Sequence, residues 1–178
     1  GRQRVKTFVV NESYRARLNA FIRKQHDEGH QTYVVCPAVE ESESGEVSQE
    51  DIRLLDFDAL PKEPPKAATV WANELQAALP DLKIGCVHGR MKSVDKDLIM
   101  SEFAAGNIDV LVSTTVIEVG VNVPNATLMI IENAERFGLS QLHQLRGRVG
   151  RGKAASNCVL VSECPPDSKA GKRLDVLR

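Results

Sequence analysis

The feature that most constrains the fold of this 178-residue chain is the alternation of short aliphatic runs with helix-like segments. The strand-like runs are residues 7–10, 32–36, 84–87, 110–113, 128–131 and 158–161. Between several of them, apolar residues recur at helical spacing, as in residues 13–28, 67–79 and 93–105. Because repeated strand–helix–strand units form parallel strands with right-handed crossovers, the sequence predicts an α/β fold with a doubly wound parallel sheet flanked by helices.

The ends of the predicted helices carry their own signals. Ser13 and Ser93 are candidate N-caps, because a serine hydroxyl accepts a hydrogen bond from a free N–H of the first turn. Gly29 and Gly106 follow two of the helices, where a glycine in the left-handed conformation commonly ends a helix. In the helix after Ser93, we expect Leu98, Ile99 and Phe103 to face the core.

The composition agrees with this class of fold. Hydrophobic residues make up 42% of the chain and aromatic residues only 4%, so the expected core is aliphatic. The net charge of −1 excludes a chain that binds nucleic acid through overall basic charge. The charge is uneven, because residues 38–63 hold nine acidic and two basic residues, whereas residues 146–178 hold eight basic and three acidic. Positive charge is therefore concentrated in the C-terminal part of the chain.

Cysteine spacing and hydropathy bear on the compartment. Cys36, Cys86, Cys158 and Cys164 show no close pairing, which favours free thiols in a reducing compartment over disulfides or zinc. No apolar run approaches the length of a membrane span, and the N-terminus lacks an apolar signal region. We therefore expect a cytoplasmic protein with no membrane contact and no metal ligands of its own.

Residues 141–152, Gln-Leu-His-Gln-Leu-Arg-Gly-Arg-Val-Gly-Arg-Gly, place three arginines and three glycines in one short run. A guanidinium is always charged and matches the oxygens of a phosphate, and glycine lets the backbone approach a ligand. The run therefore indicates an anion site that suits the polyphosphate of a nucleotide. A solvated basic turn is the alternative that these residues alone leave open.

The same run contains the spacing of a phosphate-binding P-loop, G-x-x-x-x-G-K, from Gly147 to Lys153. The next position should be Ser or Thr to hold magnesium, but it is Ala154. The run also follows a helix-like segment and precedes a strand, which is the reverse of the P-loop order. We therefore reject the P-loop interpretation, and the sequence contains no other candidate.

Polar residues follow the third and fourth predicted strands. His88, Gly89 and Arg90 come after the third, and Thr114 and Thr115 after the fourth. Ligands of doubly wound sheets bind beyond the carboxyl ends of the strands, so these residues are candidates for contacts with phosphate oxygens. A structural histidine and a Thr-capped turn remain the alternatives.

Together these motifs resemble a known family. Residues 88–91, 113–126 and 134–152 have the order and spacing of the C-terminal motor domain of superfamily-two helicases. The chain is most similar to the RecG type, bacterial ATP-dependent DNA helicases that remodel stalled forks and branched DNA. The resemblance runs from about residue 4 to residue 160. It implies a RecA-like domain, as in the C-terminal domains of P-loop NTPase-like helicases, and a bacterial cytoplasmic location.

The resemblance implies nucleotide contacts for three residues of the Arg–Gly run. Gln144, Arg148 and Arg151 match motif VI, in which Arg151 would be the arginine finger and Arg148 a second nucleotide-sensing arginine. Both would face ATP with Mg²⁺, bound mainly by a first motor domain. An arginine supplied from another domain accelerates phosphoryl transfer by roughly 10³-fold or more. Hydrolysis would then depend on closure of the two domains.

The segment after the fourth strand matches motif V. Thr114, Thr115 and Glu118 are expected to contact the DNA backbone, and Gly120 and Asn122 to contact the nucleotide. The family commonly has Asp where this chain has Asn122. Asparagine keeps a carbonyl acceptor for a ribose hydroxyl but lacks the charge.

The resemblance also implies DNA contacts and partner domains. His88, Gly89 and Arg90 match the motif between IV and V, near DNA. Residues 1–162 would form the second RecA-like domain, and residues 163–178 the start of a truncated C-terminal extension. The chain begins without Met, so we expect an excised piece whose partners are branched or forked DNA and the first RecA-like and wedge domains of the same protein.

Two alternatives stay open. The transcription-repair coupling factor, a translocase that acts on stalled RNA polymerase, has a similar Arg-Gly core, although residues 115–120 and 140–144 favour RecG. A non-catalytic interaction module with the same fold is disfavoured by the presence of both Arg148 and Arg151. For the leading interpretation, we expect the isolated chain to show no appreciable ATP hydrolysis or DNA unwinding.

Overall fold

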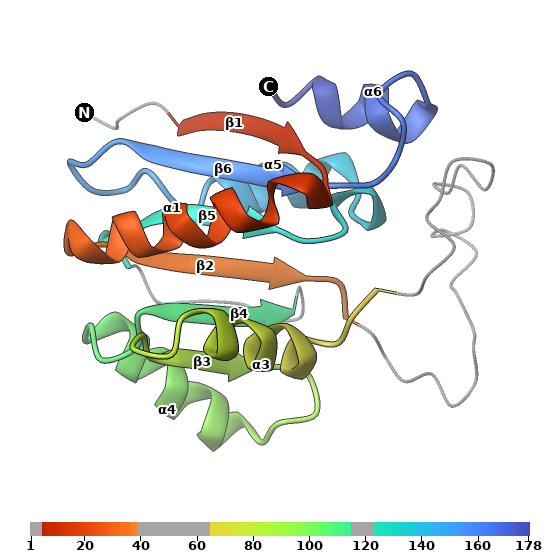
Figure 1. Ribbon diagram of the computed structural model, residues 1–178. Helices are drawn as coiled ribbons and strands as arrows, with labels where there is room; N and C mark the ends of the chain where they lie inside the picture. The colour runs from red at the N-terminus through yellow and green to blue at the C-terminus, as the bar shows by residue number, and fades with distance from the viewer. Residues whose placement is uncertain (1–4, 39–64, 115–122) are drawn as a thin grey trace.

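A six-stranded parallel sheet forms the centre of the fold, with strand order β1-β6-β5-β2-β4-β3 (Figure 1). The computed structural model describes residues 5–38, 65–114 and 123–178. The strands are β1 (Val5–Val10), β2 (Gln31–Cys36), β3 (Ile84–Val87), β4 (Val110–Thr114), β5 (Ala126–Ile131) and β6 (Ser156–Val161). Every pair of neighbouring strands is parallel, which confirms the predicted doubly wound class.

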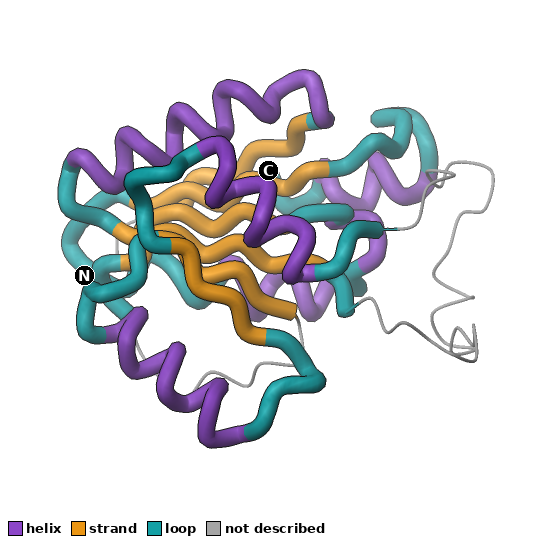
Figure 2. The backbone as a smooth tube through the Cα atoms, turned by 60° about the horizontal axis from the view of Figure 1, so that its bottom comes forward, coloured by secondary structure: helices purple, strands orange, loops and turns teal. Residues whose placement is uncertain are grey.

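Helices cover both faces of the sheet (Figure 2). The helices are α1 (Arg15–Asp27), α3 (Ala68–Ala78), α4 (Ser93–Ala104), α5 (Leu139–Arg146) and α6 (Lys169–Asp175), with short 3-10 helices η1 (Glu12–Tyr14) and η2 (Ala134–Arg136). Buried residues of α1 and α3 share one core cluster, and those of α4, α5 and α6 share the other. Among the described residues, no helix has the length and apolar character needed to cross a membrane.

The central strand β2 shows why the aliphatic runs are continuous rather than alternating. Tyr33 and Val35 belong to the core on the α4/α5 face, whereas Val34 and Cys36 belong to the core on the α1/α3 face. All six residues of β2 are buried. A strand covered on both faces needs apolar side chains at successive positions, as these runs provide.

The prediction that Gly29 and Gly106 end their helices is confirmed, whereas the predicted N-caps at Ser13 and Ser93 are wrong. Gly29 and Gly106 have φ angles of +85° and +86° after α1 and α4. Ser13 lies inside η1, whose first turn is capped by Asn11, and the Asn11 side chain accepts a hydrogen bond from the Ser13 N–H. Ser93 is the first residue within α4 and therefore does not cap it. Asparagine and serine cap equally well, so local spacing did not distinguish the two positions before α1.

The prediction that Leu98 faces the core is also wrong, because 61% of its surface is exposed. Met100 and Phe103, three residues apart on α4, are the buried side chains of this helix. Leu98 lies two positions before Met100, and two helical residues differ in direction by roughly 200°. Its side chain therefore points away from the sheet.

The cysteines are free thiols, as the sequence predicts. Cys36 and Cys158 are buried within strands β2 and β6, and burial raises the pKa of each thiol to about 12. Burial also raises the pKa of the Cys86 thiol to about 11. These thiols are packing groups and not activated nucleophiles.

Candidate functional site

The Arg–Gly run forms helix α5 and the loop that leads into β6. The helix ends at Arg146, Gly147 follows as its C-cap, and β6 begins at Ser156. Since α5 follows the carboxyl end of β5 and precedes the amino end of β6, it runs against the strand direction (Figure 1). The loop of residues 147–155, called the arginine loop from here on, therefore lies at the amino edge of the sheet.

Close backbone packing holds this loop in place. Val149 is buried at 3% exposure, and Gly150 has a φ of +78°, a left-handed conformation that favours glycine. A Cβ added at Gly152 would lie 2.7 Å from the carbonyl oxygen of Pro124, just before β5. Arg151, which is exposed, donates a hydrogen bond from Nε to the Gly147 carbonyl at 3.0 Å. The loop is thus anchored at Val149 and Gly150, which lie between Arg148 and Arg151, and at Gly152, which follows Arg151.

Arg148 and Arg151 lie on the α4/α5 face, within electrostatic range of Tyr33 on β2. Burial raises the pKa of the Tyr33 hydroxyl to about 12, and the positive charges of Arg148 and Arg151 oppose that rise. The Tyr33 ring packs edge-on against Phe103, with ring centroids 4.9 Å apart. Arg148 and Arg151 are therefore brought together over one region of the sheet. The sequence did not predict that Tyr33 lies near these arginines, because its position in an apolar strand indicates only packing.

A second group of predicted site residues lies at the opposite, carboxyl edge. His88 follows β3, and its Nδ1 accepts a hydrogen bond from the N–H of Arg90 at 3.3 Å. Thr114 ends β4, and its buried hydroxyl has no hydrogen-bond partner among the described residues. β3 and β4 are neighbours, so both positions share one edge, as predicted. Gly89 is exposed, and an added Cβ there would meet no atom within 4 Å.

The predicted site is therefore divided between the two edges of the sheet. Thr115, Glu118, Gly120 and Asn122 lie outside the described residues. The described residues nearest to them, Thr114 and Val123, stand at the carboxyl end of β4 and near the amino end of β5. Gln144 is exposed on α5 and precedes the arginine loop.

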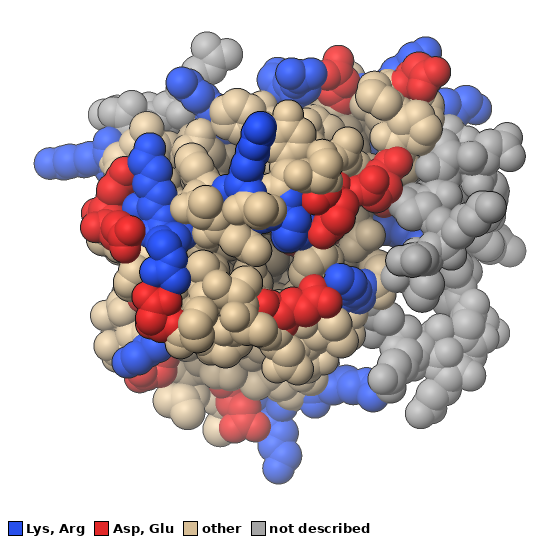
Figure 3. Space-filling model, in the orientation of Figure 1, with Lys and Arg blue, Asp and Glu red and all other residues tan. Residues whose placement is uncertain are grey.

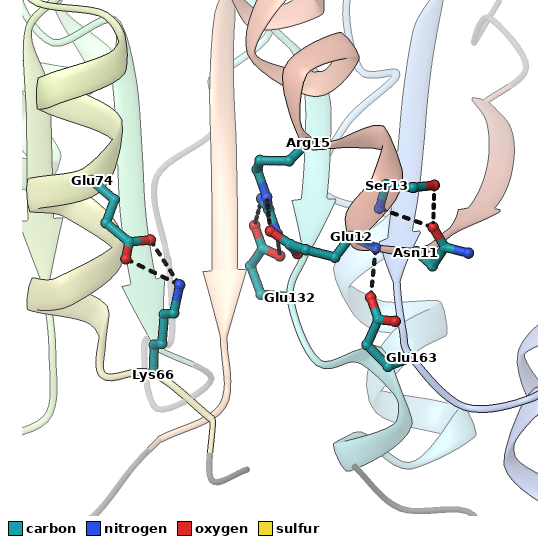
Figure 4. A network of polar contacts seen from close by, with 8 residues as sticks. All are labelled: Asn11, Glu12, Ser13, Arg15, Lys66, Glu74, Glu132 and Glu163. Carbon is teal, nitrogen blue, oxygen red and sulfur yellow. Dashed lines mark hydrogen bonds and ion pairs between the residues drawn. The ribbon is translucent and has the colours of Figure 1, made fainter. Parts of the chain in front are cut away.

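A polar network occupies the carboxyl edge on the α1/α3 face (Figure 4). Glu132 follows β5 and is only 2% exposed, and both of its carboxylate oxygens accept from Arg15, at 2.6 and 2.8 Å. Arg15 also pairs with Glu12 and lies 4.5 Å from the Trp71 ring centroid. Burial raises the pKa of Glu132, and the Arg15 guanidinium opposes this shift.

This network joins the start of α1 to the end of β5. The Glu12 N–H donates a hydrogen bond to the Glu163 carboxylate, and this bond links the network to the segment just after β6. The sequence motifs did not predict this network. The available signal was an acidic residue directly after a buried strand, since a buried carboxylate requires a partner.

The charges on the α1/α3 face of the molecule are mixed rather than of one sign. Figure 3 shows interleaved acidic and basic side chains on the face covered by α1 and α3. No group of three or more His, Cys, Asp or Glu with metal-binding geometry occurs in the part of the chain that the structure describes. The arginine loop on the other face is thus the more distinctive candidate for binding anions.

The motif order and this geometry agree with one domain family. The helicase conserved C-terminal domain matches residues 13–153, most of the chain. The chain belongs to this family. This assignment agrees with the parallel sheet and with the placement of the arginine loop between α5 and β6.

The relatives of this helicase C-terminal domain include proteins named ATP-dependent DNA helicase RecG. It is 46% identical over its whole length to the protein of Acidithiobacillus ferridurans and 48% to that of Escherichia coli strain K12. The Bacillus subtilis relative is 42% identical over 97% of the chain. The chain spans only 23% of the length of the first two. The predicted resemblance to the RecG type is confirmed.

Solved structures show the same similarity. A structure of RecG bound to a three-way DNA junction matches 99% of this chain and 20% of its own, with a TM-score of 0.74 and 37% identity. Saccharomyces cerevisiae Dbp5 bound to RNA and ADP BeF3 matches with a TM-score of 0.60 at 12% identity, which reflects the fold alone. The predicted RecA-like helicase fold is thereby confirmed.

Proposed function

We propose that this domain is the second motor domain of a RecG-type ATP-dependent DNA helicase and supplies the arginine finger of an active site completed by a first RecA-like domain. The observation that carries this proposal is the anchored loop that holds Arg148 and Arg151 on one face. The chain has no P-loop of its own, so these arginines serve a nucleotide held elsewhere. ATP and Mg²⁺ would bind mainly to the first domain.

Charge and geometry support this role. Negative charge spreads over the γ-phosphoryl oxygens during transfer, and a guanidinium placed there lowers the barrier. Arg151 is exposed on a loop whose backbone is anchored by Val149 and Gly152, so its approach follows the movement of the whole domain. Arg148 would sense the nucleotide from the same loop, with Gln144 on the adjoining helix.

The proposal assigns DNA and nucleotide contacts to the remaining motif residues. The DNA-facing residues are His88, Gly89, Arg90, Thr114, Thr115 and Glu118; the nucleotide-facing residues are Gly120 and Asn122. The buried hydroxyl of Thr114, which has no hydrogen-bond partner among the described residues, supports a polar role at this edge. Branched or forked DNA is the proposed substrate, in keeping with the RecG structure on a three-way junction. The first RecA-like and wedge domains would be intramolecular partners, in the bacterial cytoplasm.

We also propose the division of the chain at residue 162. Residues 1–162 would form the motor domain, and residues 163–178 would begin a C-terminal extension. Leu174 and Leu177 of this segment are buried in the same core cluster as α5. The Arg173 side chain donates to the Glu135 carbonyl, and Arg146 donates to the Leu177 carbonyl. The extension would thus begin as a part of the motor core.

The direct test is Arg151→Ala in the full-length protein. We expect kcat for DNA-stimulated ATP hydrolysis to fall by about 10³-fold, with little change in KM for ATP, because the arginine acts on the transition state. Lys24→Ala, at an exposed position on α1, is the control. Unchanged turnover in Arg151→Ala would favour a non-catalytic module. Unwinding of a synthetic fork, compared with displacement of stalled RNA polymerase, would separate the RecG role from that of a transcription-repair coupling factor.

A further inference from the structure

The segment that leads into β5 is a tight turn beside the arginine loop. The Ala126 N–H donates to the Val123 carbonyl at 3.0 Å, which closes a turn with Pro124 and Asn125 at its centre. Proline presets the backbone angle of the first central position of such a turn, and asparagine is a common turn residue. Val123 and Ala126 are 3% and 1% exposed, so both ends of the turn are fixed in the core.

Asn125 connects the tip of this turn to the start of β2. Its side-chain amide donates to the Gly29 carbonyl at 2.7 Å, and its backbone carbonyl accepts from the Gln31 N–H at 2.9 Å. The same side-chain amide donates a longer hydrogen bond to Gln31 Oε1, at 3.4 Å. Gly29 has a φ of +85°, and this left-handed conformation sets the direction of its carbonyl.

Gln31 extends this support to α4. Its side chain is buried, and its Nε2 donates to the carbonyls of Phe103, at 2.6 Å, and Ile108, at 2.8 Å. Phe103 belongs to α4, and Ile108 lies just before β4. Asn125 therefore bonds to a residue that is itself held in the core. Asn125 is exposed, so its replacement removes these side-chain contacts without opening a cavity.

The position of Arg151 depends on this turn, because the next residue, Gly152, rests on it. A Cβ added at Gly152 would lie 2.7 Å from the Pro124 carbonyl oxygen, so the two backbones are in close contact. The arginine loop contains three glycines, and such a backbone has little stiffness of its own. Buried Val149 supports the loop before Arg151, and the contact with Pro124 supports it after Arg151.

We propose that Asn125 is a positioning residue for Arg151: by fixing the Pro124 turn against Gly152, it sets the position from which the guanidinium reaches the nucleotide. This inference rests on the role proposed above for Arg151. Asn125 acts through Gly152 and needs to touch neither ATP nor DNA. A displacement of about 1 Å at a reacting group can lower a rate by roughly 10²-fold, so a modest shift of this turn is enough to affect turnover.

The test is DNA-stimulated ATP hydrolysis by the full-length protein. In Asn125→Ala we expect kcat to fall by roughly tenfold with little change in KM for ATP, because the finger acts on the transition state. Asn125→Asp keeps the shape of the side chain but loses the N–H donor, and its kcat should fall equally. Asn73→Ala, at an exposed position on α3, should turn over like the wild type. In the Arg151→Ala background, Asn125→Ala should lower kcat no further, because it acts through Arg151.

Hydrogen exchange separates this inference from the catalytic role of Arg151. Without ATP, the amides of residues 150–153 should exchange several-fold faster in Asn125→Ala than in the wild type, whether or not Arg151 is catalytic. Unchanged exchange, a wild-type kcat in Asn125→Ala, or an additive loss in the double variant would overturn the positioning role. A wild-type kcat in Arg151→Ala would instead overturn the proposed function on which the inference rests.

Discussion

Gly152 lies against the backbone of Pro124, so closely that an added Cβ would stand 2.7 Å from the Pro124 carbonyl oxygen. Gly152 ends the Arg–Gly run, and Pro124 lies just before β5. This contact joins the loop that carries Arg148 and Arg151 to the segment just before β5. It is a backbone contact, so no side-chain rotation can relieve an added methyl group.

Gly152→Ala should therefore destabilise the domain. We expect the free energy of unfolding to fall by about 1–3 kcal/mol, as for other overpacked sites, when measured by urea denaturation. Gly89→Ala is the matched control, because its added Cβ meets no atom within 4 Å; its change should stay within about 0.5 kcal/mol. Equal losses in the two variants would contradict the close packing at Gly152.

Arg151→Lys separates charge from geometry in the proposed finger. Lysine keeps the positive charge but lacks the planar fork and the Nε that donates to Gly147 at 3.0 Å. In the full-length protein we expect kcat for ATP hydrolysis to fall by about 10²-fold, less than for Arg151→Ala. Wild-type turnover in the lysine variant would show that charge alone suffices.

The buried pair of Arg15 and Glu132 should be strongly coupled. Arg15→Ala leaves a carboxylate that is 2% exposed without its bidentate partner, and we expect a loss of about 3 kcal/mol in the free energy of unfolding. Adding Glu132→Gln should recover part of this loss, because a neutral amide is easier to bury. Additive effects in the double-mutant cycle would show that the pair is not coupled.

Glu135 should make stability depend on pH. Both of its carboxylate oxygens are buried with no hydrogen-bond partner among the described residues. Burial raises the pKa of Glu135, and its own backbone and the nearby Ser162 hydroxyl only partly oppose this shift. A raised pKa means that the folded state favours the protonated acid. The contribution of Glu135 to stability is therefore fully present below its unfolded-state pKa and is lost as the pH rises through its folded-state pKa.

Glu135→Gln isolates this effect, because the amide does not ionise in this range. Urea denaturation between about pH 4 and pH 8 should show the variant gaining stability relative to the wild type as the pH rises. A constant difference across this range would show that Glu135 does not titrate differently in the folded and unfolded states.

Local sequence patterns predicted most of the fold. The aliphatic runs became the six strands, and Gly29 and Gly106 ended their helices in the left-handed conformation. These features depend on backbone periodicity and on conformations that glycine favours, both of which act over a few residues. The predicted caps at Ser13 and Ser93 are wrong, and so is the predicted direction of Leu98. In each case several nearby residues satisfied the same local sequence pattern.

By itself, the sequence determined the parallel α/β class, the free thiols and the motifs that mark a RecG-type helicase domain. Only the tertiary structure decided that Arg148 and Arg151 lie within electrostatic range of Tyr33, on the α4/α5 face of the sheet. It alone placed Gly152 against Pro124 and paired Arg15 with Glu132, 117 residues apart in the chain. Such contacts depend on the crossovers and on how the layers pack, and spacing along the chain does not encode the distance between two residues on different elements.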